Sequence, residues 1–129
     1  MIAVIEPGIG RTSQPMVFKI VARAQWEEAC LVGSYSGSLD DERDGYIHLS
    51  SPHQVEGTLK KYFSRQGDLL LVAFESADLG SDLRWERSRG GDLFPHLYAS
   101  LRPDLALWAK PLALDQDGHP TCNKAWLSC

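Results

Sequence analysis

An uninterrupted apolar run from Leu69 to Phe74 constrains the fold more than any other feature of the sequence. Strands that are covered on both faces are apolar at nearly every position, whereas half-exposed strands alternate. The run is far shorter than the roughly 20 residues of a membrane-spanning helix. We therefore predict a strand at 69–74 in the centre of a sheet.

Short segments of alternating or apolar residues predict further strands on both sides of this run. Successive side chains of a strand point to opposite faces, so these segments bury one face more than the other. Pro95 has no backbone N–H, and its strand is therefore predicted at the edge of a sheet. The predicted strands cover residues 17–21, 46–50, 69–74, 83–86, 93–97 and 105–109.

A first helix is predicted over about residues 24–32. Trp26, Ala29 and Cys30 recur at the spacing of one helical face, and we expect Cys30 to be a small buried side chain. Gly33 is a typical helix stop. The polar segment 34–44 follows, and it is predicted to be a loop that serves as a mobile lid or as a plain connection.

A second helix begins at a capping box formed by Ser51 and Gln54, with Pro52 in its first turn. Gly67 is expected to end it. The side chains predicted on its buried stripe are Val55, Leu59, Tyr62 and Phe63. Both helices thus fall in the N-terminal half of the chain.

A chain of 129 residues has room for a single domain. Several strands with two helices near the start predict an α+β domain at 16–114. Residues 1–15 contain two prolines and two glycines without sustained periodicity, which predicts a flexible leader. Residues 115–129 are expected to form an irregular tail.

The charge and cysteine content narrow the possible partners. The net charge is −4 and the longest basic run is the pair at 60–61, so general nucleic-acid binding is disfavoured. No apolar segment reaches the length of a membrane span. The three cysteines match no metal-site spacing, which favours a reducing compartment, and we expect the cytoplasm.

The strand at 46–50 is the first candidate for a functional site. Tyr46, His48 and Ser50 share one of its faces, so an imidazole and a hydroxyl can contact one ligand. A histidine satisfied within a polar network fits the same pattern.

The segment from Trp85 to Gly91 is the second candidate. Glu86 lies at the end of a predicted strand, beside a glycine-rich turn where a ligand can approach the backbone closely. Arg87 and Arg89 have the side chains that bind phosphate in bidentate fashion. The same residues can also form exposed Arg–Glu pairs on a loop, which are common and contribute little.

The segment from Phe94 to Tyr98 is the third candidate. Alternation places Phe94, His96 and Tyr98 on one face, where rings suit stacking on a base or on nicotinamide. The same pattern is found at the edge of an ordinary core.

Taken together, three segments are similar to the bacterial domain of unknown function 952 family. They are Asp44–Ser50, Trp85–Ser88 and Phe94–Tyr98, and the resemblance runs from about Phe18 to about Leu101. Further matching residues are Lys19, Ile20, Trp26, Gly33, Gln54, Val55, Tyr62 and Phe63. The family has no established activity, but its fold resembles that of ADP-ribosyltransferases.

That resemblance implies small split or mixed sheets with NAD bound as a substrate in the cleft between them. It implies that Glu86 is the carboxylate that stabilises charge on the ribose. The early strand has Lys19 where these enzymes have an Arg or a His, so His48 would take over that role. Phosphate contacts would come from an arginine such as Arg89. The remaining ligand-binding residues it implies are Lys19, Tyr46, Ser50, Trp85, Ser88, His96 and Tyr98.

Besides a structural or interaction domain with no ligand, in which the polar clusters are edge networks, three readings of the function remain open from the sequence. The first is an NAD-using enzyme, a transferase or an NAD glycohydrolase. The second is a module that binds a nucleotide or small metabolite without catalysis, and the resemblance requires no metal for either. The third is a metal-dependent hydrolase that uses His48, His96 and Glu86, although their spacing does not demand such a site. The sequence does not identify a protein partner.

Overall fold

The computed structural model describes residues 15–127, without the side chain of Arg89. The first sheet has the strand order β1-β3-β6, with β1 at Met16–Ala22, β3 at Leu69–Glu75 and β6 at Trp108–Pro111. The apolar run therefore forms the central strand, as predicted. Neighbouring strands are antiparallel throughout the sheet. Val72 and Phe74 pack into one apolar cluster and Leu71 and Ala73 into another, so both faces of β3 are buried.

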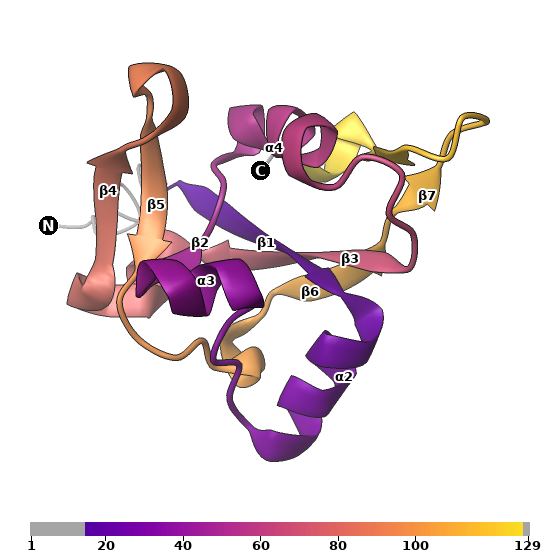
Figure 1. The fold of residues 1–129 in the computed structure, drawn as a ribbon. Coiled ribbons are helices and arrows are strands. Elements are labelled where there is room, and N and C mark those ends of the chain that lie inside the picture. Colours follow the sequence, from indigo (N-terminus) through magenta and orange to yellow (C-terminus); the bar gives the residue numbers. More distant parts are fainter. Residues whose placement is uncertain (1–14, 128–129) are drawn as a thin grey trace, which may run out of the picture.

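Two helices cover the opposite faces of this sheet (Figure 1). Helix α2, Arg23–Val32, packs Trp26 and Ala29 into the first cluster, and α4, Val55–Tyr62, packs Val55 and Leu59 into the second. As predicted, α2 ends at Gly33, whose φ is 93° and whose N–H bonds to the carbonyl of Ala29.

Three expectations about these helices are wrong. Cys30 is exposed, because it lies beside the buried face of α2 and not within it. Tyr62 is 50% exposed, so the buried stripe of α4 is narrower than predicted. Helix α4 also ends at Tyr62, five residues before Gly67. The expected capping box is present, since Gln54 Oε1 accepts from Ser51 N at 3.0 Å, but it caps the 3-10 turn Pro52–Gln54 that leads into α4.

The second sheet has the order β2-β5-β4, with β2 at Ile47–His48, β5 at Leu93–Leu97 and β4 at Leu83–Arg87. It too is antiparallel. The prediction of β5 as an edge strand is wrong, because β5 lies between two partners. The Pro95 carbonyl accepts from Leu49 N at 3.0 Å, just beyond the two-residue β2. Because the N and C=O of one residue in an antiparallel strand point to the same neighbour, the bond that proline cannot make is the one to Leu49, beyond the end of β2, and the pairing with β4 is not affected.

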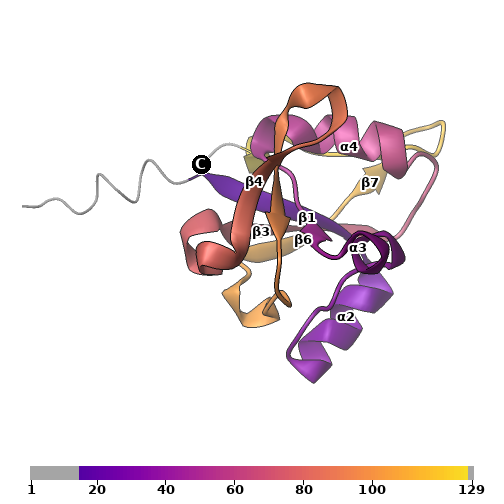
Figure 2. The ribbon, with the colours of Figure 1, turned by 60° about the vertical axis from the view of Figure 1, so that its left-hand side comes forward.

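Residues 47–50 pass from the second sheet to the first. Ile47 and His48 pair with β5, whereas Ser50 exchanges two backbone hydrogen bonds with Phe18 of β1, at 2.8 and 2.9 Å. The two sheets are thus joined by backbone. Figure 2 shows β4 and β5 running across the direction of β1, so the sheets diverge from this junction.

The polar segment 34–44, predicted as a loop, contains helix α3 at Leu39–Asp44. Ser38 caps it, because its Oγ accepts from Asp41 N at 3.2 Å. In return, Asp41 Oδ2 accepts from Ser38 N at 2.9 Å. Gly45, with a φ of 86°, ends the helix. The buried side chain of α3 is Asp41, so apolar periodicity gave no sign of this helix.

The C-terminal segment is more regular than expected. Strand β6 begins three residues after the predicted 105, and β7 (Ala113–Leu114) pairs with β8 (Pro120–Thr121). Trp126 packs against the cluster beneath α4, where Lys110 Nζ lies 4.6 Å from the ring centroid of Trp108 and 5.1 Å from that of Trp126. The 3-10 helices of the described chain are Pro52–Gln54, Ser76–Asp82, Arg89–Gly91, Pro103–Leu105 and Lys124–Leu127.

The fold is therefore α+β, with small, separate antiparallel sheets where split or mixed sheets were expected. Residues 1–14 of the predicted leader lie outside the described residues. Pro15 is included, and its carbonyl accepts from Ser76 N at 3.2 Å. Among helices within residues 15–127, none has the length and apolar character needed to cross a membrane.

Candidate functional site

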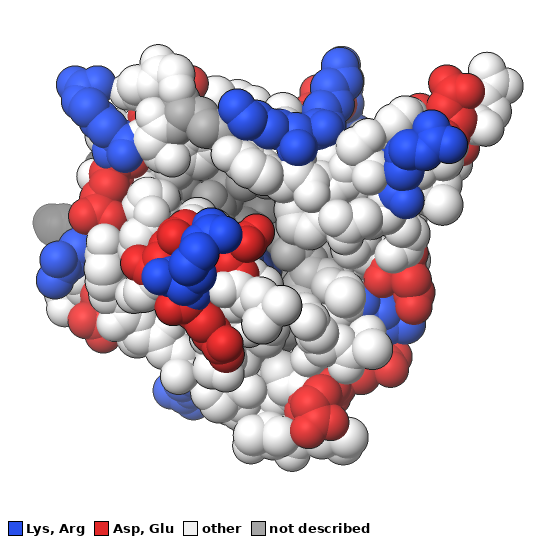
Figure 3. All heavy atoms as spheres, viewed as in Figure 1, with Lys and Arg blue, Asp and Glu red and all other residues white. Residues whose placement is uncertain are grey.

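A cavity of about 220 Å³ lies where the two sheets diverge, bordered by α3 on one side and α4 on the other. Figure 3 shows the surface hollowed beside the charged side chains that gather over α3. The lining side chains come from β1, α3 and its cap, the 46–50 segment, α4 and the residue after it, the turn after β4, and β5. They are Phe18, Lys19, Ile20, Ser38, Asp40, Asp41, Arg43, Asp44, Tyr46, His48, Leu49, Ser50, Thr58, Tyr62, Phe63, Ser88, Phe94 and His96.

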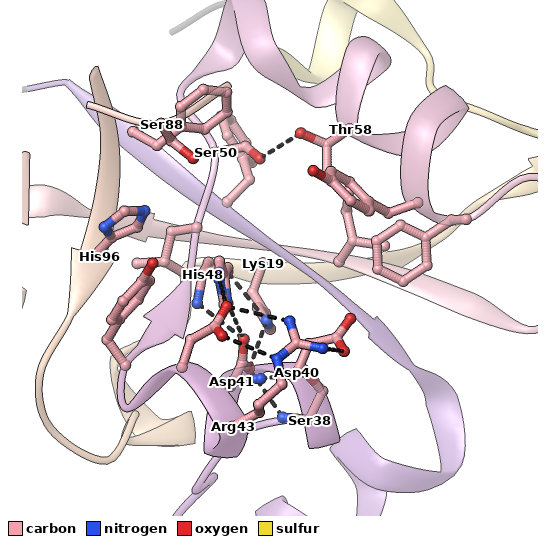
Figure 4. A pocket seen from close by; sticks show the side chains of 18 residues that line it. Lys19, Ser38, Asp40, Asp41, Arg43, His48, Ser50, Thr58, Ser88 and His96 are labelled. Carbon is pink, nitrogen blue, oxygen red and sulfur yellow. Dashed lines mark hydrogen bonds and ion pairs between the residues drawn. The ribbon is translucent and has the colours of Figure 1, made fainter. Parts of the chain in front are cut away.

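A buried ion pair forms the lower end of the cavity in Figure 4. Lys19 Nζ lies 2.8 Å from Asp41 Oδ2, and the two residues are only 5% and 2% exposed. Lys19 also donates to the backbone carbonyl of His48 at 3.0 Å. The ammonium group of Lys19 is therefore held by these two structural contacts and does not extend freely toward a ligand.

Asp41 is the centre of this network. Its carboxylate faces Lys19 Nζ, Ser38 N, His48 N and His48 Nδ1, the last at 2.6 Å. Burial by itself would raise the pKa of Asp41, but the hydrogen bond with His48 and the nearby ammonium outweigh it. The pKa of Asp41 therefore lies well below its usual range. Burial also lowers the pKa of Lys19, but with these donors around the carboxylate the ionised pair is favoured.

His48 is held between two carboxylates of α3. Its Nδ1 faces Asp41 and its Nε2 lies 2.9 Å from Asp44 Oδ2. A neutral imidazole has one N–H, so both contacts are satisfied together only when the ring carries two protons. Arg43, which contacts Asp40 and Asp44, adds a cation at the rim. His48 therefore anchors α3 to the second sheet as well as lining the cavity.

A second polar group lies on the same face of the second sheet. His96 is the cross-strand partner of His48, and its Nδ1 lies 2.8 Å from Glu86 Oε1. The same oxygen accepts from the Tyr98 hydroxyl at 2.7 Å. The ring of Tyr46 stacks on His96, with centroids 4.0 Å apart and an angle of 26° between the planes.

The upper end of the cavity is less charged. Ser50 and Thr58 face each other with their hydroxyl oxygens 3.2 Å apart, and Ser88 lies on the β5 side (Figure 4). Phe63 and Phe94 supply apolar walls. The cavity therefore combines aromatic side chains, hydroxyl groups and the imidazoles of His48 and His96, a lining suited to a small planar ligand with polar substituents.

The sequence model described as protein of unknown function (DUF952) matches residues 20–109 of the chain. The chain belongs to this family. It is also similar to protein CC0527 of Caulobacter crescentus. The crystal structure of CC0527 has a TM-score of 0.80 and 44% identity, over 82% of this chain and 93% of that one. Its solution NMR structure has a TM-score of 0.74 and 45% identity, over 81% and 90%. No curated protein matches the chain.

In this DUF952 chain the cavity brings together most of the residues predicted from sequence. Lys19, Tyr46, His48, Ser50, Ser88 and His96 all line it. Glu86 and Tyr98 lie behind His96 and do not line it. Trp85 points to the opposite face of β4, in register with the buried Pro95. The side chain of Arg89 lies outside what the structure describes.

Sequence reasoning missed the carboxylates of α3. Asp41 and Asp44 stood in a segment predicted to be a loop, and a buried aspartate has no hydropathy signal. The spacing from Ser38 to Asp41 was the available clue, since serine followed three residues later by an acidic residue marks many helix starts.

The residues of the metal-hydrolase reading do not converge on one point. His96 faces Glu86, whereas His48 faces Asp41 and Asp44. Over residues 15–127, no group of three or more His, Cys, Asp and Glu side chains is arranged to hold an ion. The geometry therefore gives this reading no support.

Proposed function

We propose that the protein binds a nucleotide, with NAD as the first candidate, by placing one base and its ribose in the cavity between the sheets. The observation that carries the proposal is the lining of that cavity. Aromatic side chains of Phe63 and Phe94 provide contacts for a flat ring. Ser50, Ser88 and His96 provide polar groups for hydroxyl or amide substituents.

The size of the cavity limits how much of a nucleotide it encloses. Its volume of about 220 Å³ is below the roughly 300–1,000 Å³ of pockets that enclose drug-sized ligands. A dinucleotide would therefore place one half inside and leave the other at the open mouth. The position between two small sheets is also where the ADP-ribosyltransferase resemblance places NAD, and this supports the proposal by analogy of fold.

Binding is better supported than turnover. A transferase or an NAD glycohydrolase needs a carboxylate against the ribose, where positive charge develops. Glu86, the residue expected to supply it, accepts hydrogen bonds from His96 and Tyr98 outside the cavity lining. The binding function consequently needs no rearrangement of Glu86, whereas catalysis through that carboxylate does.

A titration followed by amide chemical shifts tests the proposal. NAD, nicotinamide mononucleotide and AMP are added separately to the full chain, and nicotinamide release is assayed in parallel. We expect saturable shifts at His48, Ser50 and Phe94. Ser50→Ala should weaken binding, whereas Ser100→Ala, at an exposed loop position, should not. Shifts absent at millimolar concentrations of all three nucleotides would reject the proposal, and released nicotinamide would add catalysis to it.

A further inference from the structure

The hydrogen bonds of Glu86 determine which nitrogen of His96 carries a proton. Glu86 Oε1 receives the Tyr98 hydroxyl and faces Nδ1 of His96. The hydrogen bonds with Tyr98 and with His96 lower the pKa of Glu86, and the bond to Glu86 raises the pKa of Tyr98. Glu86 is therefore a carboxylate that only accepts, so Nδ1 of His96 must be the donor. In the neutral ring, Nε2 then has a lone pair.

The free edge of the His96 ring faces the cavity. His96 lines the cavity and Glu86 does not, so the Nδ1 edge is turned away from it and the Nε2 edge toward it. Figure 4 places the ring beside Ser88 and Ser50 at the cavity's edge. His96 is 3% exposed and stacked on Tyr46, which opposes ring rotation. No described residue donates to Nε2.

We propose that Nε2 of His96 accepts a hydrogen bond from the ligand, and that Glu86 is a positioning residue that fixes the tautomer. The site then selects ligands that present an amide N–H or a hydroxyl at this point over ligands that present a carboxylate. A carboxylate would bring its lone pairs against that of Nε2, close to the negative charge of Glu86. The inference rests on the proposed nucleotide-binding function.

Nicotinamide mononucleotide and nicotinic acid mononucleotide form the matched test pair, because they differ only in an amide and a carboxylate. Their Kd values are compared at mildly alkaline pH, where an ordinary imidazole is neutral. We expect the full chain to prefer the amide by about tenfold, the order of one hydrogen bond lost beside a charged group.

Glu86→Gln is the decisive variant. Its amide can donate to Nδ1 as well as accept from it, so Nδ1 is no longer fixed as the protonated nitrogen and the proton of His96 can move to Nε2 without a change in the cavity lining. The preference for the amide nucleotide should then fall. Glu56→Gln removes the same charge from an exposed position on α4 and should leave the preference intact. If Glu86 only maintained the structure, Glu86→Gln would weaken the binding of both nucleotides by the same factor.

The outcomes separate the two proposals. Equal affinity of the wild-type chain for both nucleotides overturns the role of His96 while leaving nucleotide binding in place. If neither nucleotide binds, the proposed function fails, and the imidazole ¹⁵N spectrum of the free protein decides the inference. A proton on Nδ1 in the wild-type protein that moves to Nε2 in Glu86→Gln supports it. A proton on Nε2 of the wild-type ring overturns it.

Discussion

Lys19 Nζ lies 2.8 Å from Asp41 Oδ2, which ties the middle of β1 to helix α3 across 22 residues of sequence. The pair is buried, and each partner also bonds to the backbone of His48. Three elements that border the cavity are thus held by two charged side chains. A buried pair of this kind is costly to break from one side, because the remaining charge has no compensation.

Asp41→Asn should therefore lower the free energy of unfolding by about 3–5 kcal/mol, the usual cost of removing one partner of a buried ion pair. Urea denaturation measures this. Asp40→Asn, one residue earlier and mostly exposed, should change stability by less than about 0.5 kcal/mol. Equal effects of the two substitutions would show that the network around Asp41 contributes no special stability.

The same network predicts acid sensitivity. The pKa of Asp41 is lowered in the folded protein, so its ionisation stabilises the fold above the unfolded-state value of about 3.9. That contribution is lost progressively as the pH falls from about 4 toward the lower folded pKa. The difference in Tm between wild type and Asp41→Asn should shrink as the pH is lowered through this range. A constant difference would contradict the assignment.

Gly37 should resist substitution for a steric reason. Its φ is +112°, and an added Cβ would lie 2.7 Å from Cβ of Asp41. Gly118 has a φ of +85° but open space around it, so Gly118→Ala measures backbone strain alone, about 1–2 kcal/mol. Thermal unfolding should show a clearly larger loss for Gly37→Ala. Equal losses would mean that α3 shifts to accommodate the methyl group.

The hydroxyl of Tyr35 should be removable without loss of stability. It is buried and has no hydrogen-bond partner among the described residues. Tyr35→Phe should therefore be neutral or stabilising, because it removes a desolvated polar group and no bond. Tyr35→Leu should destabilise, since it also removes the ring packed against Trp26. A loss above about 1 kcal/mol for Tyr35→Phe would reveal a partner such as a bound water.

The sequence predicted those parts of the molecule that depend on apolar pattern. The run at 69–74 gave the central strand, and alternation placed His48 and His96 on the polar face of the second sheet. Helix α3 escaped detection because its apolar Leu39 is 82% exposed and its buried side chain is Asp41. Burial of a charge depends on partners distant in sequence, here Lys19, and no local pattern reports it.

Pro95 shows a second limit of sequence reasoning. A proline forbids one backbone hydrogen bond, which ordinarily excludes it from an inner strand. Strand β2 ends at His48, and Leu49, the next residue, donates to the Pro95 carbonyl. The side of Pro95 that lacks an N–H therefore faces the end of β2. The contacts of Glu86 could not be predicted from the sequence for a related reason. Its place at the end of a strand was evident, but its hydrogen bonds with His96 and Tyr98 depend on the register of β4 and β5.

The passage of residues 47–50 from one sheet to the other has a consequence for how the site can diversify. Because Ser50 and Phe18 are paired by backbone, the spacing of the walls near this junction is set by main-chain geometry and not by the lining side chains. Substitutions at Phe63, Ser88 or Phe94 would change what the cavity accepts while its frame stays the same. The frame and the lining can therefore vary independently of one another.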